Sequence, residues 1–411
     1  MSSNIHAVSN VSATLPWYAR TILSLLEKIQ VGQLTLASPE GEKFIFRGAQ
    51  SGIEANIQIH DWSVCKACLK SGDIGLAETY IDGLWDSTDV QSLLRLFLIN
   101  RQVIEKAIYG SWWGRLGYRI KHWLNKNSKA GSKKNIHAHY DIGNAFYSLW
   151  LDPSMTYSSA CFKNQDTSLI EAQEAKYQRI INSINVKPGD NILEVGCGWG
   201  GLMEAASKQG LHIDCLTISK EQATYAQDRA KRIKSCDSGK VNILIQDYRD
   251  HEKQYDGIAS IEMFEAVGEK YWATYFEMIQ RCLKPGKRAC IQTIVIADNL
   301  FDKYRRSSDF IQQYVFPGGM LPSITKFKEA AQSKGLIVED VYQFGQDYQK
   351  TLCLWHQKFN HHLQEIKQQG FDEKFIRLWN LYLMYCAAGF AEKSTDVVQF
   401  TLSKPANNAI K

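Results

Sequence analysis

The most informative stretch of this 411-residue chain is Asn191-Ile-Leu-Glu-Val-Gly196-Cys-Gly198-Trp-Gly200-Gly201. A short apolar run runs directly into a cluster of glycines, which permit a tight turn and a close approach of the backbone to a ligand. A helix that follows such a turn offers free N–H groups to that ligand. The stretch therefore predicts a strand, turn and helix that bind a nucleotide-like cofactor.

The same glycines leave two cofactor classes to compare. Gly196, Gly198 and Gly201 also satisfy the dinucleotide pattern G-x-G-x-x-G, which is a weak signal alone. Glu194, two residues before the first glycine, suits the ammonium group of S-adenosylmethionine and would repel a pyrophosphate. The acidic residue that a dinucleotide needs about 20 positions further on would be Asp214, which falls inside a predicted strand. These residues favour S-adenosylmethionine over a nicotinamide cofactor.

A later strand end supports the same cofactor. Gln246-Asp247-Tyr248 follows a predicted strand, so its carboxylate can accept from an adenine amino group and its ring can cover the base. We therefore expect adenine contacts at Asp247 and Tyr248.

Strands alternate with amphipathic helices over the second part of the chain, which predicts a parallel sheet covered on both faces. We expect helical additions at 301–314 and 350–390, capping this sheet over an acyl channel. The predicted strands are Asn191–Val195, His212–Thr217, Val241–Ile245, Gly257–Ile261, Ala289–Ile296 and Val397–Leu402. The expected fold class is α/β: a Rossmann-like class I methyltransferase sheet with helical cap insertions, plus a small α+β N-terminal domain.

Three regions divide the chain. Residues 1–114 combine short strand-like runs with helical patterns and are expected to form the small α+β domain, which would face lipid. Residues 115–134 form a basic linker, with the composition Lys-Asn-Ser-Lys-Ala-Gly-Ser-Lys-Lys near its end. Residues 135–411 are expected to form the methyltransferase domain.

Charge and hydropathy point to a membrane surface. No acidic residue occurs between Glu105 and Asp141, where seven basic residues follow Trp112 and Trp113. Cations beside tryptophans suit an anionic lipid surface, although a solvated linker has the same composition. The net charge of +5 calls for no nucleic acid. Ten scattered cysteines, a polar N-terminus and the lack of any apolar run of about 18 residues predict a cytoplasmic protein, bound peripherally to the inner face of the membrane.

Several ordered motifs resemble one enzyme family. They are His139-Tyr140-Asp141-Ile-Gly-Asn, Leu151 to Ala160, Glu194 to Gly201, Thr217-Ile-Ser-Lys-Glu-Gln222, Gln246 to Asp250, Met263-Phe-Glu265-Ala-Val-Gly, Phe316-Pro-Gly-Gly and Phe344-Gly-Gln-Asp-Tyr348. Together they resemble the cyclopropane-fatty-acyl-phospholipid synthase family from about His139 to Lys404. The resemblance implies transfer of a one-carbon unit from S-adenosylmethionine to the cis double bond of an unsaturated acyl chain in a membrane phospholipid, forming a cyclopropane ring.

The resemblance also implies a set of catalytic residues. Methyl transfer to an alkene leaves a carbocation, which needs a negative or π-rich lining and a base. In the family the base is a bound bicarbonate, held by a glutamate, a histidine, a tyrosine and backbone near a cysteine. The glutamate corresponds to Glu265 and the tyrosine to Tyr348. The histidine position is Gln292, and the cysteine position is Ser159. Cys386 matches a cysteine sometimes assigned to the active site, but the mechanism requires no covalent step, so packing is the favoured interpretation.

The two replacements leave the product open. Glutamine can hydrogen-bond an oxyanion but cannot share a proton at neutral pH as imidazole does. A mid-chain methyl- or methylene-branched fatty acid is therefore an alternative to the ring. Two further alternatives are a small-molecule methyltransferase of the same superfamily and a non-catalytic lipid-binding relative.

The resemblance places the remaining site residues as well. The cofactor set is Tyr157, Ser158, Glu194, Gly196, Gly198, Gly200, Thr217, Gln222, Asp247, Tyr248 and Ile261, and the substrate set is His139 and Tyr140. No metal is expected, because Cys65-x-x-Cys68 with His60 nearby lacks a second pair at ligand spacing. The sequence leaves open whether the chain forms a homodimer.

Overall fold

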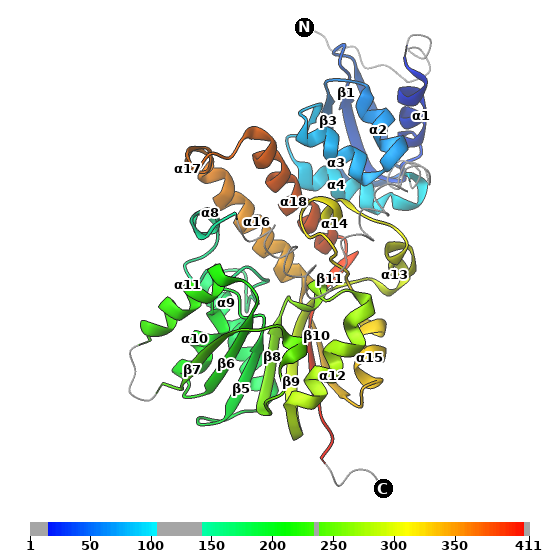
Figure 1. The fold of residues 1–411 in the computed structure, drawn as a ribbon. Helices are drawn as coiled ribbons and strands as arrows, with labels where there is room; N and C mark the ends of the chain where they lie inside the picture. Colours follow the sequence, from blue (N-terminus) through cyan, green and yellow to red (C-terminus); the bar gives the residue numbers. More distant parts are fainter. Residues whose placement is uncertain (1–14, 105–141, 234–237, 407–411) are drawn as a thin grey trace. The chain divides into compact units, whose positions relative to one another are not determined.

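The computed structural model describes residues 15–104, 142–233 and 238–406, which fold into two compact units (Figure 1). Unit 1 contains the described residues before 105 together with 306–315 and 363–393. Unit 2 contains the other described residues, including the glycine-rich stretch. Part of the chain that follows the methyltransferase motifs thus belongs to the N-terminal unit.

A seven-stranded sheet forms the centre of unit 2. Its order is β10-β11-β9-β8-β5-β6-β7, and β11 runs antiparallel to both of its neighbours while the strands from β9 to β7 are parallel. The strands are β5 (Asn191–Val195), β6 (His212–Thr217), β7 (Val241–Ile245), β8 (Tyr255–Ile261), β9 (Leu283–Ile296), β10 (Ile337–Gln343) and β11 (Thr395–Ser403). All six predicted strands are confirmed. β10 lies outside the predicted strands, since it is an edge strand that is mostly exposed and carries acidic residues.

Helices cover both faces of this sheet (Figure 1). The helices of unit 2 are α8 (Asn144–Trp150), α9 (Leu169–Ile184), α10 (Gly201–Lys208), α11 (Lys220–Lys231), α12 (Trp272–Cys282), α13 (Asp298–Arg305), α15 (Ile324–Gln332) and α16 (Gly345–His361). Neighbouring strand residues alternate between the two cores: Ile192 packs on the side of α9 and α10, whereas Leu193 packs on the side of α12 and α15. The predicted doubly covered α/β sheet is confirmed.

Unit 1 is an α+β unit with a four-stranded sheet of order β2-β1-β3-β4. Its strands are β1 (Val31–Ala37), β2 (Lys43–Arg47), β3 (Gln50–Ile59) and β4 (Trp85–Asp86). Its helices are α1 (Trp17–Leu26), α2 (Ser63–Ser71), α3 (Asp73–Ile81), α4 (Val90–Ile99), α14 (Phe310–Tyr314), α17 (Leu363–Gln368) and α18 (Glu373–Ala391).

Specific contacts tie the late segments into unit 1. The Tyr385 hydroxyl donates to Asp73 at 3.0 Å, and Arg95 pairs with Glu392 at 2.6 Å. The Arg377 guanidinium donates to the Trp85 carbonyl at 2.8 Å. We had expected 301–314 and 350–390 to cap the methyltransferase sheet. Only α13 and α16 belong to that unit, since α14, α17 and α18 complete unit 1.

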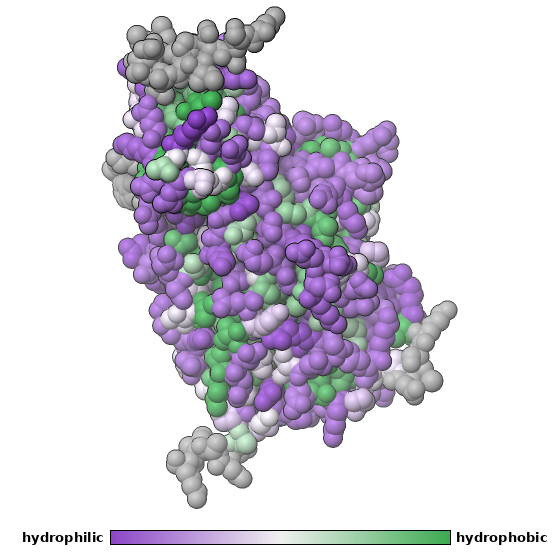
Figure 2. Space-filling model, turned by 180° about the vertical axis from the view of Figure 1, so that it is seen from behind, coloured by the Kyte–Doolittle hydropathy of each residue, from purple (hydrophilic) through white to green (hydrophobic). Residues whose placement is uncertain are grey.

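The exterior is mainly polar, with separate apolar patches on the face drawn in Figure 2. Among the described residues, no helix is both long and apolar enough to cross a membrane. The basic segment 115–134 and the predicted substrate residues His139 and Tyr140 lie outside the described residues.

Candidate active site

The glycine-rich turn lies at the carboxyl end of β5, where parallel α/β sheets bind their ligands. Gly196, Gly198 and Gly200 all have positive φ, at 83°, 48° and 81°. A Cβ on Gly196 would lie 2.8 Å from Met263, so this position excludes any larger residue. A Cβ on Gly198 would meet nothing within 4 Å. The turn therefore presents open space above Gly198.

Glu194 is 2% exposed, immediately before this turn. The Cys215 thiol donates to it at 3.7 Å. Burial raises the pKa of Glu194 to about 8, against the opposing effects of Cys215, Arg229 and Lys176. A cationic group bound beside this carboxyl would favour its ionised form.

Polar side chains follow the ends of the next two strands, β6 and β7. The Ser219 N–H donates to Thr217 Oγ1 at 3.2 Å, and Thr217 in turn donates to Gln222 Oε1 at 3.2 Å. Asp247, after β7, pairs with Arg249 at 2.6 Å. The ring of Tyr248 packs edge-on against Tyr275.

Ile261 is the last residue of β8, and its side chain packs against the core on the α9 and α10 side of the sheet. Together with Thr217, Gln222, Asp247 and Tyr248, it follows or ends a strand of the sheet. The predicted cofactor residues of β6, β7 and β8 thus gather at one end of the sheet, where the carboxyl ends of its parallel strands lie side by side.

Aromatic rings from α8, α16 and the segment between α8 and α9 pack together. Tyr157 packs against Tyr147, Trp150 and Trp355, with ring centroids 5.4–5.5 Å apart. Trp355 also meets Tyr348 edge-on at 6.1 Å. Tyr157, predicted to contact the cofactor, and Tyr348, predicted to be catalytic, therefore belong to one aromatic cluster.

Ser158 and Ser159 are both buried and form hydrogen bonds with different residues. Lys176 Nζ donates to Ser158 Oγ and to Gln173 Oε1, each at 2.6 Å. Burial lowers the pKa of Lys176 to about 7, although the nearby carboxylates of Glu262, Asp152 and Glu194 favour its charged form. A fully buried lysine whose pKa is lowered is unusual outside functional sites.

Glu262 collects donors from three separate elements. The Ser159 N–H donates to Glu262 Oε1 at 2.9 Å, and Gln292 Nε2 donates to the same oxygen at 2.8 Å. The Tyr348 hydroxyl donates to Glu262 Oε2 at 2.6 Å. Three of the predicted catalytic residues therefore meet at a carboxylate outside the predicted site.

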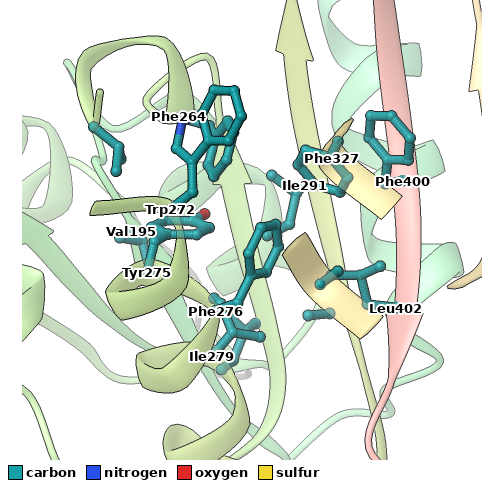
Figure 3. Packing of buried hydrophobic residues seen from close by; sticks show 14 of the residues in the cluster. Val195, Phe264, Trp272, Tyr275, Phe276, Ile279, Ile291, Phe327, Phe400 and Leu402 are labelled. Atoms are coloured by element: carbon teal, nitrogen blue, oxygen red, sulfur yellow. The ribbon is translucent and has the colours of Figure 1, made fainter. Parts of the chain in front are cut away.

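Glu265 lies one turn further on, in the 3-10 turn η3 (Phe264–Ala266). The fully buried Phe264 anchors this turn among Trp272, Tyr275 and Phe327 (Figure 3). The Ile294 N–H donates to Glu265 Oε1 at 2.5 Å, whereas Oε2 is buried without a hydrogen-bond partner in the described structure. Burial and the charge of Glu262 raise the pKa of Glu265 to about 8.

Gln292 is held in one orientation by β11. It is fully buried on β9, and Gln399 Nε2 donates to its Oε1 at 3.0 Å. This contact leaves the Gln292 amide nitrogen directed at Glu262, which as a carboxylate can only accept. The replacement of a histidine by glutamine therefore comes with a partner that orients the amide.

Cys386 lies on α18 in unit 1, whereas Glu265, Tyr348, Gln292 and Ser159 all lie in unit 2. Burial and the charge of Asp309 raise the pKa of the Cys386 thiol far above its usual range. A neutral thiol is a poor nucleophile, so this environment suits a packing role.

Two functional candidates were missed in the sequence. Glu262 directly follows β8, three residues before Glu265, at the sheet edge where such sites form. Lys176 lies on the buried stripe of α9, between Gln173 and Tyr177, where a lysine breaks the apolar pattern. Both signals were present, but neither identifies a partner without the tertiary structure.

The fold and the site define a class I S-adenosylmethionine-dependent methyltransferase. Residues 127–400 match the family model described as mycolic acid cyclopropane synthetase. The chain therefore belongs to that family.

Individual relatives agree. The chain is 34% identical over 358 residues to cyclopropane-fatty-acyl-phospholipid synthase of Escherichia coli, covering 87% of this chain and 90% of that protein. It is also 34% identical over 343 residues to tuberculostearic acid methyltransferase UfaA1 of Mycobacterium tuberculosis, covering 81% and 79%. The solved structure of mycolic acid cyclopropane synthase CmaA1 complexed with SAH and CTAB superposes with a TM-score of 0.62 at 31% identity, covering 66% of this chain and 98% of that one.

Proposed function

We propose that this enzyme transfers the methyl carbon of S-adenosylmethionine to the cis double bond of an unsaturated phospholipid acyl chain and closes a cyclopropane ring. One observation carries the proposal: two carboxyls, Glu262 and Glu265, lie beside an aromatic cluster at the carboxyl end of the parallel strands, where the cofactor residues are expected. An alkene that accepts a methyl cation becomes a carbocation, and this lining of negative charge and π faces can stabilise it.

The residues present fit S-adenosylmethionine, which supplies an electrophilic methyl group when bound. The open space at Gly198 admits a ligand against the backbone, and Gly196 and Gly200 keep the turn in its positive-φ shape. The buried Glu194 suits the ammonium group of the methionine portion. Thr217 and Gln222 suit the ribose, and the Asp247 and Tyr248 pair suits the adenine.

A second product is favoured by one specific relative. The similar protein UfaA1 is described as a tuberculostearic acid methyltransferase, and Gln292 takes the place of the family's histidine here. A methylene branch would arise if a hydride shifted from the methylated carbon to the neighbouring cation before the new methyl lost a proton. Loss of a proton from the chain instead would leave a methyl-branched alkene. We therefore keep branching as the alternative outcome of the same methyl transfer.

We also propose peripheral binding to the inner face of an anionic membrane through the basic segment 115–134. Its lysines and arginines follow Trp112 and Trp113, a pairing suited to a phospholipid headgroup layer. Contact with the bilayer would give the enzyme access to its acyl substrate.

The deciding experiment is expression in a bacterial host that lacks such an enzyme, followed by mass analysis of its fatty acids. We expect a gain of one CH₂ unit that resists hydrogenation. A gain that hydrogenates would indicate a methylene branch or a relocated double bond, and a further gain of two hydrogens would indicate a saturated methyl branch. Unchanged fatty acids, in cells that contain folded protein able to bind S-adenosylmethionine, would refute lipid methylation and favour a non-catalytic or small-molecule role.

A further inference from the structure

We propose that the carboxylate of Glu262 is the built-in base of this reaction and takes the place of an exogenous bicarbonate. The inference rests on the proposed function, because a base is needed only if an acyl carbocation forms. It concerns a residue outside the motifs that carried the family resemblance.

Three hydrogen-bond donors around Glu262 favour this role. The resemblance assigns to bicarbonate the tyrosine, the histidine position and the backbone near the cysteine position, here Tyr348, Gln292 and Ser159. In this structure all three donate to Glu262, at 2.6, 2.8 and 2.9 Å. A bicarbonate would find these donors already occupied by a carboxylate of the protein. The residues present therefore do not fit bicarbonate.

The backbone supplies an independent observation. Glu262 has φ of 48°, one of four non-glycine residues with positive φ among those described. The left-handed region is unfavourable for a residue with a side chain, so surrounding contacts must hold it there. The Glu262 N–H donates to the Gln292 carbonyl at 2.8 Å and fixes this conformation. A strained glutamate at this position indicates that its side chain serves a purpose.

The charges around Glu262 suit a base. Its three donors and the ammonium of Lys176 oppose the effect of burial, which raises its pKa. Burial and the charge of Glu262 raise the pKa of Glu265 to about 8, and the Glu265 Oε2 atom has no hydrogen-bond partner among the described residues. Three hydrogen-bond donors favour the ionised form of Glu262, which suits this carboxylate to accept a proton.

The reaction proceeds by methyl transfer, followed by proton removal and ring closure. The π electrons of the acyl double bond form a bond to the methyl carbon, whose bond to sulfur breaks with its electron pair left on sulfur. The neighbouring acyl carbon becomes a cation. Glu262 removes a proton from the new methyl group, and that C–H pair closes the ring. The products are a cyclopropane, S-adenosylhomocysteine and a neutral Glu262 carboxyl, which releases its proton before the next turnover.

The test uses the full-length enzyme with S-adenosylmethionine and vesicles of unsaturated phosphatidylglycerol, in carbon dioxide-free buffer and in buffer with added bicarbonate. We expect the wild-type rate to be the same in both. Glu262→Gln should lower ring formation by about 10²- to 10⁴-fold, the usual contribution of a general base, while cofactor affinity stays nearly unchanged. The matched control is Glu277→Gln, an exposed position on α12 that should keep the full rate.

Glu262→Gly provides a second variant that relieves the positive φ and opens the carboxylate's space. We expect it to be as slow as Glu262→Gln without carbon dioxide and to recover at least about tenfold with bicarbonate or formate. A wild-type rate that depends on bicarbonate, a fully active Glu262→Gln, or no rescue of Glu262→Gly overturns the inference. Absence of any lipid product from the wild-type enzyme would instead refute the proposed function itself.

Discussion

At the scale of single residues, the site depends on where protons and hydrogen-bond donors reside. The Glu262 carboxylate accepts hydrogen bonds from Ser159, Gln292 and Tyr348, which lie on a loop, a strand and a helix. Hydrogen bonds to a buried ionised group contribute more free energy than neutral ones do. Removal of any one donor to Glu262 should therefore change the catalytic rate measurably.

Removal of the Tyr348 hydroxyl should therefore slow catalysis more than it weakens cofactor binding. In Tyr348→Phe, Glu262 loses the 2.6 Å hydrogen bond at Oε2. A bond of this kind is worth about 1.5–3 kcal/mol, or about 10- to 100-fold in kcat. Calorimetry with S-adenosylmethionine should show a nearly unchanged Kd. Equal losses in kcat and in affinity would contradict the role assigned to Tyr348.

The glycine turn allows a test of the cofactor pocket with a close control. Gly198 and Gly189 both have positive φ and open space around a Cβ, but only Gly198 lies in the turn after β5. Alanine at either position should cost about 1 kcal/mol of stability because of the backbone conformation. Only Gly198→Ala should also weaken S-adenosylmethionine binding, by about tenfold or more, measured by calorimetry. Equal binding by both variants would place the cofactor elsewhere.

At the scale of elements, α16 joins the catalytic tyrosine to the loop that carries Ser159. Thr351 Oγ1 accepts from the buried Ala160 N–H at 3.1 Å, and the Asp347 carboxylate accepts from the Phe162 N–H at 2.9 Å. The first turns of α16 thus hold the loop and Tyr348 in one arrangement.

Thr351→Val should disturb this connection with little change in volume. The Ala160 N–H would be left buried without a partner, which costs about 1–3 kcal/mol. We expect a lower urea midpoint and a reduced kcat, since Ser159 is the neighbour of Ala160. Thr224→Val, on an exposed face of α11, removes a similar hydroxyl and should change stability by less than about 0.5 kcal/mol. Similar effects in both variants would argue against a special role for α16.

At the scale of the whole molecule, buried carboxyls couple stability to pH. Glu194 and Glu265 have folded pKa values of about 8, well above the ordinary value of 4.5. Between these values the folded protein holds protons that the unfolded chain releases. The free energy of unfolding should therefore fall as pH rises through this window.

Urea denaturation between about pH 5 and 7 avoids the effect of Lys176, which has a folded pKa of about 7 and an ordinary value of 10.5 and acts mainly above this range. Asp309, whose pKa is raised to about 7, adds to the fall, and His251, whose pKa is lowered, opposes it, so the comparison of variants identifies the part due to Glu194. There each glutamate contributes at most about 1.4 kcal/mol per pH unit. Glu194→Gln should flatten the pH dependence, whereas Glu277→Gln should leave it unchanged. Stability that rises with pH across this range in the wild-type protein would contradict the buried, protonated state of these carboxyls.

Contacts between segments that are far apart in the sequence complete unit 1. Unit 1 needs α14 and α18, more than 200 residues beyond α3, and contacts such as Tyr385 to Asp73 hold them there. Local patterns correctly predicted these stretches as helical. They could not reveal which sheet the helices join, because an apolar helix face packs equally well against either core.

The sequence by itself determined the α/β class, six of the seven strands of the large sheet, the glycine turn and the set of motifs typical of the family, because strand periodicity and turn chemistry are local properties. Only the tertiary structure decided that β10 closes the sheet edge, that α18 belongs to unit 1 and that Tyr348 faces Glu262 rather than Glu265. The physical reason is that a hydrogen bond between residues 86 positions apart depends on how strands and helices pack, and no local pattern encodes that packing.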